Sequence, residues 1–183
     1  MVTVLVPLAQ GCEELEAVTV IDLLRRAGIE VVTASLDGQP VRASRGVTLI
    51  ADTVLDPIMD QEFDMIVLPG GSLGADHLDR DPRIRALLVK MAQHDKYTAA
   101  ICAAPKVLGH AELLRGRKAT GYPGVLDTMG LTEVTLSNEA VVKDGKVITS
   151  RGPGTAMDFA LSLIETLVGK AKRDEVEAAL VRS

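Results

Sequence analysis

The sequence predicts one α/β domain in which a mostly parallel sheet lies between two layers of helices. The first observation is that strand-like and helix-like segments alternate along the chain, the pattern of parallel strands joined by helical crossovers. The second is that segments 2–8 and 64–68 are nearly continuous apolar runs, typical of strands buried on both faces. The third is that the 183 residues contain no linker, repeat or low-complexity stretch, so the domain is predicted to span 1–183.

The first half of the chain predicts strands around one long helix. Strands are expected over 2–8 and 30–36, with one or two short strands inside 41–51. The helix is expected from Glu14 to Ala27, because apolar residues recur at helical spacing and Gly28 follows two arginines as a stop signal.

The second half repeats the alternation. Strands are expected over 64–68, 97–102, 118–120 and 146–149, and the segments 134–136 and 140–142 are expected to flank a hairpin-like region. Helices are expected over 81–94, 105–114, 155–168 and 172–181. Thr155 and Asp158 resemble a capping box at the start of the third of these helices.

Composition narrows the function classes. A net charge of −5 argues against a phosphate-binding nucleic-acid surface, and 2% aromatic residues argue against a base-stacking platform. The two cysteines and three histidines lack the spacing of a disulfide framework or a metal site, so no metal is expected. No basic leader and no apolar run of ~18 residues is present, so we expect a cytoplasmic protein without a membrane segment.

Cys102 is the strongest candidate nucleophile. It ends the predicted strand 97–102, and Pro105 fits the first position of the helix that follows. Unpaired N–H groups and the positive end of a helix dipole at such a place favour the reactive thiolate, in the geometry of a nucleophile elbow. The same segment is also typical of a buried, unreactive cysteine.

Two other strand ends offer partners for this cysteine. The backbone N–H groups of 69–74 are candidate oxyanion donors, although the segment also fits a plain glycine turn. Glu13, Glu14 and Glu16 crowd one helix start, where the helix dipole alone explains acidic residues. A glutamic acid that points toward Cys102 would be able to bind the sulfur or move a proton, and spacing leaves open which of the three does so. The segment 152–155 fits either an anion nest or the start of a helix.

Taken together, these motifs resemble the ThiJ/PfpI superfamily, in particular the branch of the Parkinson-disease protein deglycase (the DJ-one branch) with its bacterial YajL-like members. The resemblance covers essentially the whole chain and rests on six segments in the same order: 11–18, 23–28, 44–47, 67–71, 99–105 and 149–155. It implies a flavodoxin-like three-layer sandwich that forms a homodimer and needs no cofactor.

The resemblance also implies roles for individual residues. Cys102 would be the nucleophile, Glu16 its carboxylate neighbour, and the amides of Gly70, Gly71 and Ala103 would bind an oxyanion. Arg26, Arg45, Ser150 and Arg151 match positions near the family's pocket or dimer interface, where surface or helix-end charge is the simpler explanation.

Two departures from the family pattern matter. Relatives of the protease-like subgroup carry a histidine directly after the cysteine, whereas this chain has Ala103, which argues against a cysteine–histidine pair of that kind. Other members place a histidine just before the proline after the next strand, and here Tyr122 takes its place, as an aromatic residue does in YajL-like members. Glu16 is left as the main candidate for proton transfer.

The resemblance therefore implies a cysteine-dependent glyoxalase or deglycase. Its substrates would be methylglyoxal, glyoxal or their early adducts, and its product a hydroxy acid. A redox-sensing stress protein or chaperone that works through oxidation of Cys102 is the alternative, because one accessible thiol of low pKa suits both roles. A metabolite-binding module without turnover is the third possibility.

Overall fold

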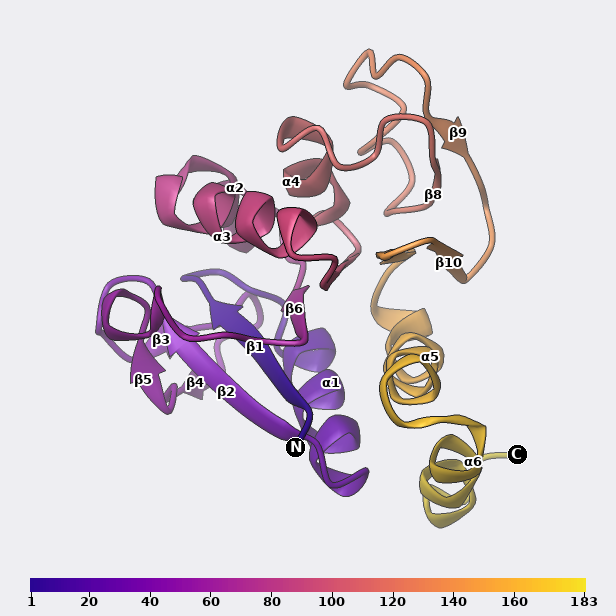
Figure 1. Cartoon of the computed structure of the whole chain (residues 1–183). Coiled ribbons are helices and arrows are strands. Elements are labelled where there is room, and N and C mark those ends of the chain that lie inside the picture. Colours follow the sequence, from indigo (N-terminus) through magenta and orange to yellow (C-terminus); the bar gives the residue numbers. More distant parts are fainter.

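A seven-stranded sheet forms the centre of the computed structural model, which describes residues 1–183 (Figure 1). The strand order is β10-β11-β7-β6-β1-β2-β5, and every neighbouring pair is parallel except β10 and β11. The strands are β1 (Thr3–Leu8), β2 (Glu30–Ser35), β5 (Thr53–Val54), β6 (Met65–Leu68), β7 (Tyr97–Ile101), β10 (Val141–Asp144) and β11 (Val147–Ser150). The predicted α/β fold with a mostly parallel sheet is confirmed.

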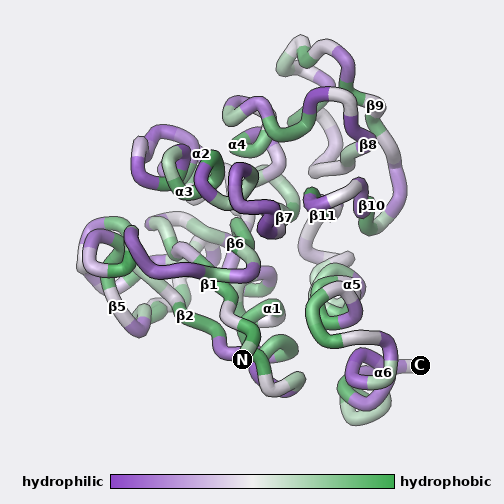
Figure 2. The backbone as a smooth tube through the Cα atoms, in the orientation of Figure 1, coloured by the Kyte–Doolittle hydropathy of each residue, from purple (hydrophilic) through white to green (hydrophobic).

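Helices cover both faces of the sheet (Figure 1). One face carries α1 (Glu14–Arg26) and α5 (Ala156–Val168), with α6 (Lys170–Ala179) packed on α5; the other carries α2 (Ser72–Arg80), α3 (Pro82–Gln93) and α4 (Pro105–His110). Side chains alternate along β1, so that Val4 and Val6 enter the core under α1 while Leu5 enters the core under α3. Figure 2 shows hydrophobic residues concentrated in β6 and α1, as two buried layers require.

Two small sheets lie outside the central one. β3 (Val41–Arg42) and β4 (Thr48–Leu49) pair antiparallel, as the short strands expected within 41–51. β8 (Lys118–Ala119) and β9 (Thr135–Leu136) pair parallel. The predicted hairpin between 134–136 and 140–142 is therefore wrong. These segments belong to different sheets, and the hairpin is β10–β11, which turns at Gly145 with φ of +60°.

Three helix predictions need correction. The sequence analysis named no helix over 72–80, where α2 lies. The helix expected over 105–114 ends at His110, because residues 111–114 form turns. Thr155 makes no capping hydrogen bond to α5; its hydroxyl interacts instead with Ser150 Oγ at 2.7 Å, and residues 153–155 form a short 3-10 turn.

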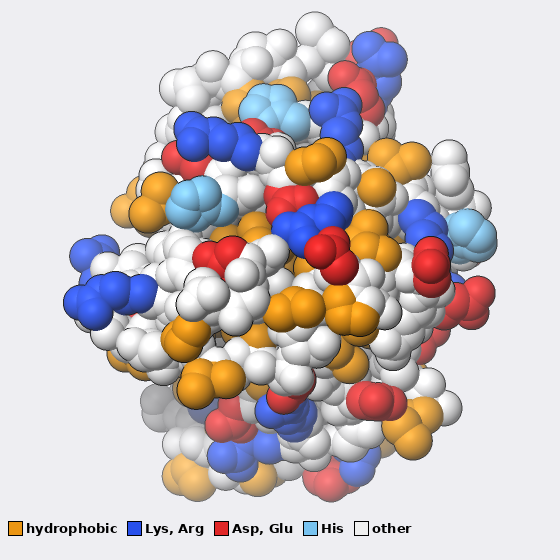
Figure 3. Space-filling view, turned by 90° about the vertical axis from the view of Figure 1, so that its left-hand side faces the viewer, with side chains coloured by type: hydrophobic (Ala, Val, Ile, Leu, Met, Phe, Trp, Pro, Cys, Tyr) orange, Lys and Arg blue, Asp and Glu red, His pale blue; other side chains and the backbone are white.

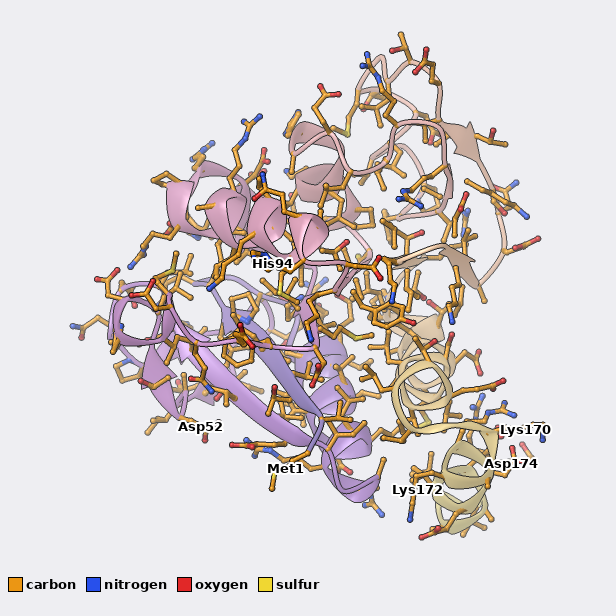
Figure 4. All side chains as sticks on the ribbon, viewed as in Figure 1. Met1, Asp52, His94, Lys170, Lys172 and Asp174 are labelled. Atoms are coloured by element: carbon orange, nitrogen blue, oxygen red, sulfur yellow. The ribbon has the colours of Figure 1, made fainter.

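Polar contacts hold the edges of the fold. Asp52, labelled in Figure 4, accepts hydrogen bonds from the Thr33 N–H at 3.0 Å and from Arg25 at 2.9 Å, which ties the chain before β5 to β2 and α1. Partial burial opposes ionisation, but these hydrogen bonds outweigh it and lower the pKa of Asp52. Lys170 and Asp174, also labelled, form an exposed ion pair along α6, and solvent screening leaves such a pair little effect on stability.

The outer surface is mixed in character. Figure 3, which shows the left-hand side of Figure 1, has positive and negative side chains interspersed with small apolar patches. None of the helices has both the length and the apolar character that a bilayer-spanning segment needs.

Candidate active site

Three loops converge at the carboxyl ends of the central strands β7, β6 and β1. These strands are neighbours in the sheet, so the segments that follow them, at 102–104, 69–74 and 9–14, meet at one edge. Hydrogen bonds join the segments: the Glu13 N–H donates to the Gly70 carbonyl at 3.0 Å, and the Tyr122 N–H donates to the Cys102 carbonyl at 2.8 Å. The convergence expected from the sequence is present.

Cys102 occupies a strained turn between β7 and α4. Its φ is +66°, a conformation that costs a non-glycine residue about 1–2 kcal/mol. Its side chain is nearly buried, with 8% of the residue exposed. The backbone N–H groups of Gly71 and Ala103 act on its sulfur in the direction that lowers the pKa of the thiol. A strained turn that aims a thiol at backbone donors is the geometry of a nucleophile elbow.

Glu16 is the glutamate that reaches Cys102. It lies in the first turn of α1 and is fully buried, with 0% exposure. Its Oε1 accepts a hydrogen bond from the Gly70 N–H at 3.0 Å, and its Oε2 is buried without a partner. Burial raises the pKa of Glu16 to about 7, against the lowering effect of its contacts with the Cys102 side chain and the Gly70 N–H.

The environment of Cys102 is less favourable to the thiolate than the sequence predicts. Burial and the negative charge of Glu16 raise the pKa of the Cys102 thiol to about 12, although the Gly71 and Ala103 amides act in the opposite direction. The predicted preference for the thiolate considered only the helix start and omitted these two effects. Thiol and carboxyl are therefore coupled, because a negative charge on one opposes ionisation of the other, and the pair gains its first negative charge as the pH rises through about 7.

Gly70 separates the two groups and leaves no room for a side chain. A β-carbon there would lie 2.6 Å from Cys102 Cβ, 2.6 Å from Glu16 Oε1 and 2.8 Å from the Ile101 carbonyl oxygen. The Gly70 N–H is bonded to Glu16, so the role of the Gly70 amide as an oxyanion donor stays a prediction that requires this bond to open. Gly71 and Ala103 remain as the backbone donors beside the sulfur.

The other two glutamates have structural partners. Glu13 is the N-cap of α1: one oxygen accepts from the Leu15 N–H at 3.2 Å and the other from Ser44 Oγ at 2.8 Å. Glu14 accepts from the Arg45 N–H at 2.8 Å. Spacing left the three glutamates equivalent, and these contacts distinguish them.

A groove with a volume of about 810 Å³ opens over Cys102. Ala103, Gly71 and Tyr122 line it, and so does Arg45. The sequence analysis missed further lining residues, of which the most informative are Gln10, Arg42 and Leu73. Gln10 and Arg42 belong to no motif, and Leu73 lies in the segment 69–74, of which the sequence analysis considered only the backbone N–H groups.

Three other predicted site residues lie away from this groove. Arg26 forms an ion pair with Asp22 along α1. Ser150 is fully buried and donates to the Ala140 carbonyl at 2.7 Å, so it supports the turn before α5. Arg151 donates to Asn138 at 3.0 Å, beside a separate small cavity that Tyr122 also lines. The segment 152–155 serves as the start of a helix, with Pro153 at the groove rim.

The remaining candidates for chemistry are weaker. Cys12 is fully buried, and burial together with Glu14 and Glu13 raises its pKa to about 12. A second cavity of about 130 Å³ is lined by apolar residues such as Phe63 and Met91 and by His94, which is labelled in Figure 4, and no cysteine lines it. No three His, Cys, Asp or Glu side chains are grouped as metal ligands.

Comparison of this chain with known proteins identifies its family. A model of the DJ-1/PfpI family matches residues 2–166. The chain belongs to the DJ-1/PfpI family. Among members of this family, it is 45% identical over 181 residues to protein DJ-1 homolog A of Arabidopsis thaliana; the match covers 98% of this chain and 46% of that relative, so the chain spans about half of its length. It is 42% identical over 178 residues to protein dj-1beta of Drosophila melanogaster, covering 97% of this chain and 95% of the relative.

Other DJ-1/PfpI members add a solved structure and a named activity. The crystal structure of Drosophila melanogaster DJ-1beta superposes with a TM-score of 0.95 at 40% identity, covering 100% of this chain and 98% of that one. The glutathione-independent glyoxalase DJR-1.2 of Caenorhabditis elegans is 34% identical over 167 residues, covering 91% of this chain and 89% of the relative. The structural match supports the flavodoxin-like three-layer architecture.

Proposed function

We propose that this protein is a cofactor-independent glyoxalase or deglycase, a lyase or hydrolase that uses Cys102 as its nucleophile. The observation that carries the proposal is the buried Glu16 carboxyl group beside the Cys102 thiol, under a groove open to solvent. A relative at 34% identity is named as a glutathione-independent glyoxalase, which supports the reaction class. Fold alone would not, because one fold serves many chemistries.

The proposed reaction is an internal redox step followed by hydrolysis. Cys102 Sγ adds to the aldehyde carbon of a 2-oxo aldehyde, and the thiol proton passes through the Glu16 carboxylate to the new alkoxide oxygen, which gives a hemithioacetal and leaves Glu16 ionised. The Gly71 and Ala103 amides stabilise the oxygen on which charge develops. Glu16 then moves the proton of the former aldehyde carbon to the neighbouring carbon, while the hydroxyl proton passes from the first oxygen to the second, so the first carbon is oxidised to a thioester and the second is reduced to an alcohol. Water cleaves the thioester, releasing the hydroxy acid and the free thiol.

Steady-state kinetics with methylglyoxal test this proposal directly. Lactate is measured as the product, because loss of aldehyde also reports scavenging by any thiol or amine. Cys102→Ser is expected to abolish lactate formation while keeping the fold, since serine is a poorer nucleophile of similar size. Cys12→Ser is the matched control, and equal loss of lactate formation in both variants would refute the role of Cys102.

Redox sensing is the second candidate function. A solved structure of oxidised Toxoplasma gondii DJ-1 resembles this chain with a TM-score of 0.95 at 40% identity. The Gly71 and Ala103 amides beside Cys102 would also bind the oxygens of a sulfinate. In a stress protein or chaperone of this kind, oxidation of Cys102 would be the signal.

The proposal includes a cytoplasmic homodimer. Leu15 and Val18, one turn apart on the outer face of α1, are 50% and 44% exposed, and Ile50 after β4 is 84% exposed. Exposed apolar side chains on neighbouring elements support burial against a second copy of the chain.

A further inference from the structure

A second cavity lies between α3 and the sheet, on the face opposite α1 and α5. Its volume is about 130 Å³, and it shares no lining residue with the groove over Cys102. Its apolar walls come from β1, from the segment before β6, from β6 itself and from α3. These wall residues are Leu5, Phe63, Ile66, Leu87 and Met91. The cavity is therefore a feature of the second core and not an extension of the active site.

The walls of this cavity are buried, yet they leave a space between them. Phe63 is 3% exposed and Met91 5%, and the other three wall residues are buried more deeply. Protein interiors are close-packed, because a void leaves the atoms around it without van der Waals partners. The apolar walls offer a water molecule no hydrogen-bond partners, whereas an engineered apolar cavity of about 150 Å³ in another protein stays dry and binds benzene. A cavity of this size therefore suits a single six-membered ring.

The arrangement of the walls favours an aromatic ring. Leu5 and Ile66 are partners across β1 and β6, so they form one continuous floor. Leu87 and Met91 lie about one turn apart on α3, so both face that floor. Phe63 offers an edge-to-face contact, and the Met91 thioether offers a sulfur–aromatic contact. These contacts are specific to aromatic ligands.

The mouth of the cavity is polar and contains a lysine without an ion pair. The polar lining residues are all exposed or half-buried, which places them around the opening: Gln61, Glu62, Lys90, His94 and Lys96. Lys90 is half-buried, and its ammonium group donates one hydrogen bond, to the Met59 carbonyl at 3.2 Å. An ammonium group has three donors, so two remain for a ligand.

The other charged groups at the mouth have partners of their own. Lys96 donates to Asp64 at 3.0 Å. This hydrogen bond raises the pKa of Lys96, and Glu62 acts in the same direction. His94, labelled in Figure 4, donates through Nδ1 to the Lys90 carbonyl at 2.8 Å. Lys90 is therefore the cation at the mouth that lacks a carboxylate partner.

We propose that this cavity binds a monocyclic aromatic carboxylate, with its ring among the apolar walls and its carboxylate on Lys90. The ring supplies the packing partners that the walls lack. The charge-assisted hydrogen bond from Lys90 sets the orientation of the ligand, as a few polar groups do in apolar binding sites. This binding does not depend on the reaction proposed at Cys102.

Calorimetric titration with benzoate and with benzyl alcohol tests the role of Lys90. The two compounds share the ring and differ in charge, so we expect the wild type to bind benzoate at least about fivefold more tightly. Lys90→Met removes the ammonium group and keeps an unbranched side chain. It is expected to weaken benzoate binding at least about fivefold while leaving benzyl alcohol binding unchanged. Lys172→Met, the same change at a half-buried lysine of α6, is the matched control and should bind both as the wild type does.

A second variant tests the cavity itself. The chain contains no tryptophan, so Leu87→Trp introduces a single indole whose fluorescence reports its surroundings. We expect the emission of a buried indole, loss of benzoate binding, and an unchanged rate of Cys102 alkylation. The emission of a water-exposed indole in the folded variant would show that the cavity does not admit an aromatic ring, which would overturn the proposal.

The remaining outcomes also decide the matter. Absence of benzoate binding to the wild type overturns the proposal. Benzoate binding that persists in Leu87→Trp places the ligand elsewhere, for example in the groove over Cys102, and overturns it as well. Equal affinity of the wild type and Lys90→Met for benzoate, or equal affinity of the wild type for the two compounds, refutes the carboxylate contact. Lys90 lies at the mouth, so Lys90→Met keeps the test decisive even when Leu87→Trp does not fold.

Discussion

The Glu16 carboxyl group and the Cys102 thiol adjoin the one position, Gly70, where a β-carbon would lie 2.6 Å from both side chains. Glu16 comes from the start of α1 and Cys102 from the turn after β7, so the pair exists only because β1, β6 and β7 are neighbours. Burial raises both pKa values, that of Glu16 to about 7 and that of Cys102 to about 12. The two neighbouring groups therefore titrate as a coupled pair. The chemistry of the site follows from this coupling.

The activity should follow the ionisation of the pair. The form with one negative charge appears as the pH rises through the Glu16 pKa of about 7, so kcat/KM for methylglyoxal is expected to rise with a midpoint near pH 7. Because Glu16→Gln lacks the proton-transfer group, it is compared with the wild type by the rate of Cys102 alkylation, and its midpoint should move well above pH 7 since ionisation then belongs to a buried thiol alone. Glu175→Gln, an exposed change on α6, should keep the wild-type profile. An unchanged midpoint in Glu16→Gln would contradict the coupling.

Glu16 should also make the protein less stable at higher pH. The folded state holds the Glu16 proton up to about pH 7, whereas the unfolded chain loses it near the ordinary value of 4.5. Folding therefore takes up a proton between these pH values, and this group lowers the free energy of unfolding by about 3 kcal/mol as the pH rises through that window. Urea unfolding at pH 4.5 and pH 8 is expected to show Glu16→Gln gaining about that much relative to wild type. The same relative stability at both pH values would refute the raised pKa.

Gly70 should be far less tolerant of substitution than another glycine near the site. Gly70→Ala places a β-carbon against the Ile101 carbonyl and both active-site groups, so we expect a loss of stability of about 1–3 kcal/mol and of most activity. Gly154→Ala is the matched control, because no atom lies within 4 Å of its β-carbon. Chemical denaturation of both variants decides the matter, and similar stabilities would argue against the close approach.

The sequence predicted the mostly parallel sheet and, through the family resemblance, the pairing of Glu16 with Cys102, but not the surroundings of that pair. Continuous apolar runs predicted β1 and β6 because both are buried on two faces. Helix α2 was missed because it is polar and contains Gly74, whose β-carbon would lie 2.6 Å from Cys12 Cα. That glycine is required by a close approach between segments distant in sequence, so no local pattern reveals its purpose.

The electrostatics of the site were equally hidden in the sequence. The raised pKa of Cys102 depends on burial and on the position of Glu16, and both are properties of the fold. The Gly70 N–H donates a hydrogen bond to Glu16 at 3.0 Å, and this contact joins segments that are distant in the sequence. Arg42 has no motif and enters the groove only because the 41–49 hairpin is bonded to the loop after β1.

The assembly prediction depends on the exposed face of α1. Size-exclusion chromatography with light scattering at low micromolar concentration should give about twice the chain mass of 19.4 kDa. Val18→Asp, in the middle of that face, should shift the mass toward the monomer, whereas Val89→Asp, at an exposed position of α3, should not. A monomeric wild type would remove the homodimer from the proposal.

Mild peroxide should oxidise Cys102 and spare Cys12. Both thiols have raised pKa values, so access and hydrogen-bond donors decide between them. Cys102 is 8% exposed and lines the groove, while Cys12 is 0% exposed. The Gly71 and Ala103 amides and a protonated Glu16 would bind the sulfinate oxygens, so we expect two added oxygen atoms on Cys102 by intact-mass and peptide mass spectrometry.

Glu16→Leu removes the acid and places an apolar group beside the sulfur, which should change both the rate and the final oxidation state. First oxidation at Cys12, or wild-type behaviour of Glu16→Leu, would show that Glu16 takes no part in the chemistry of the thiol.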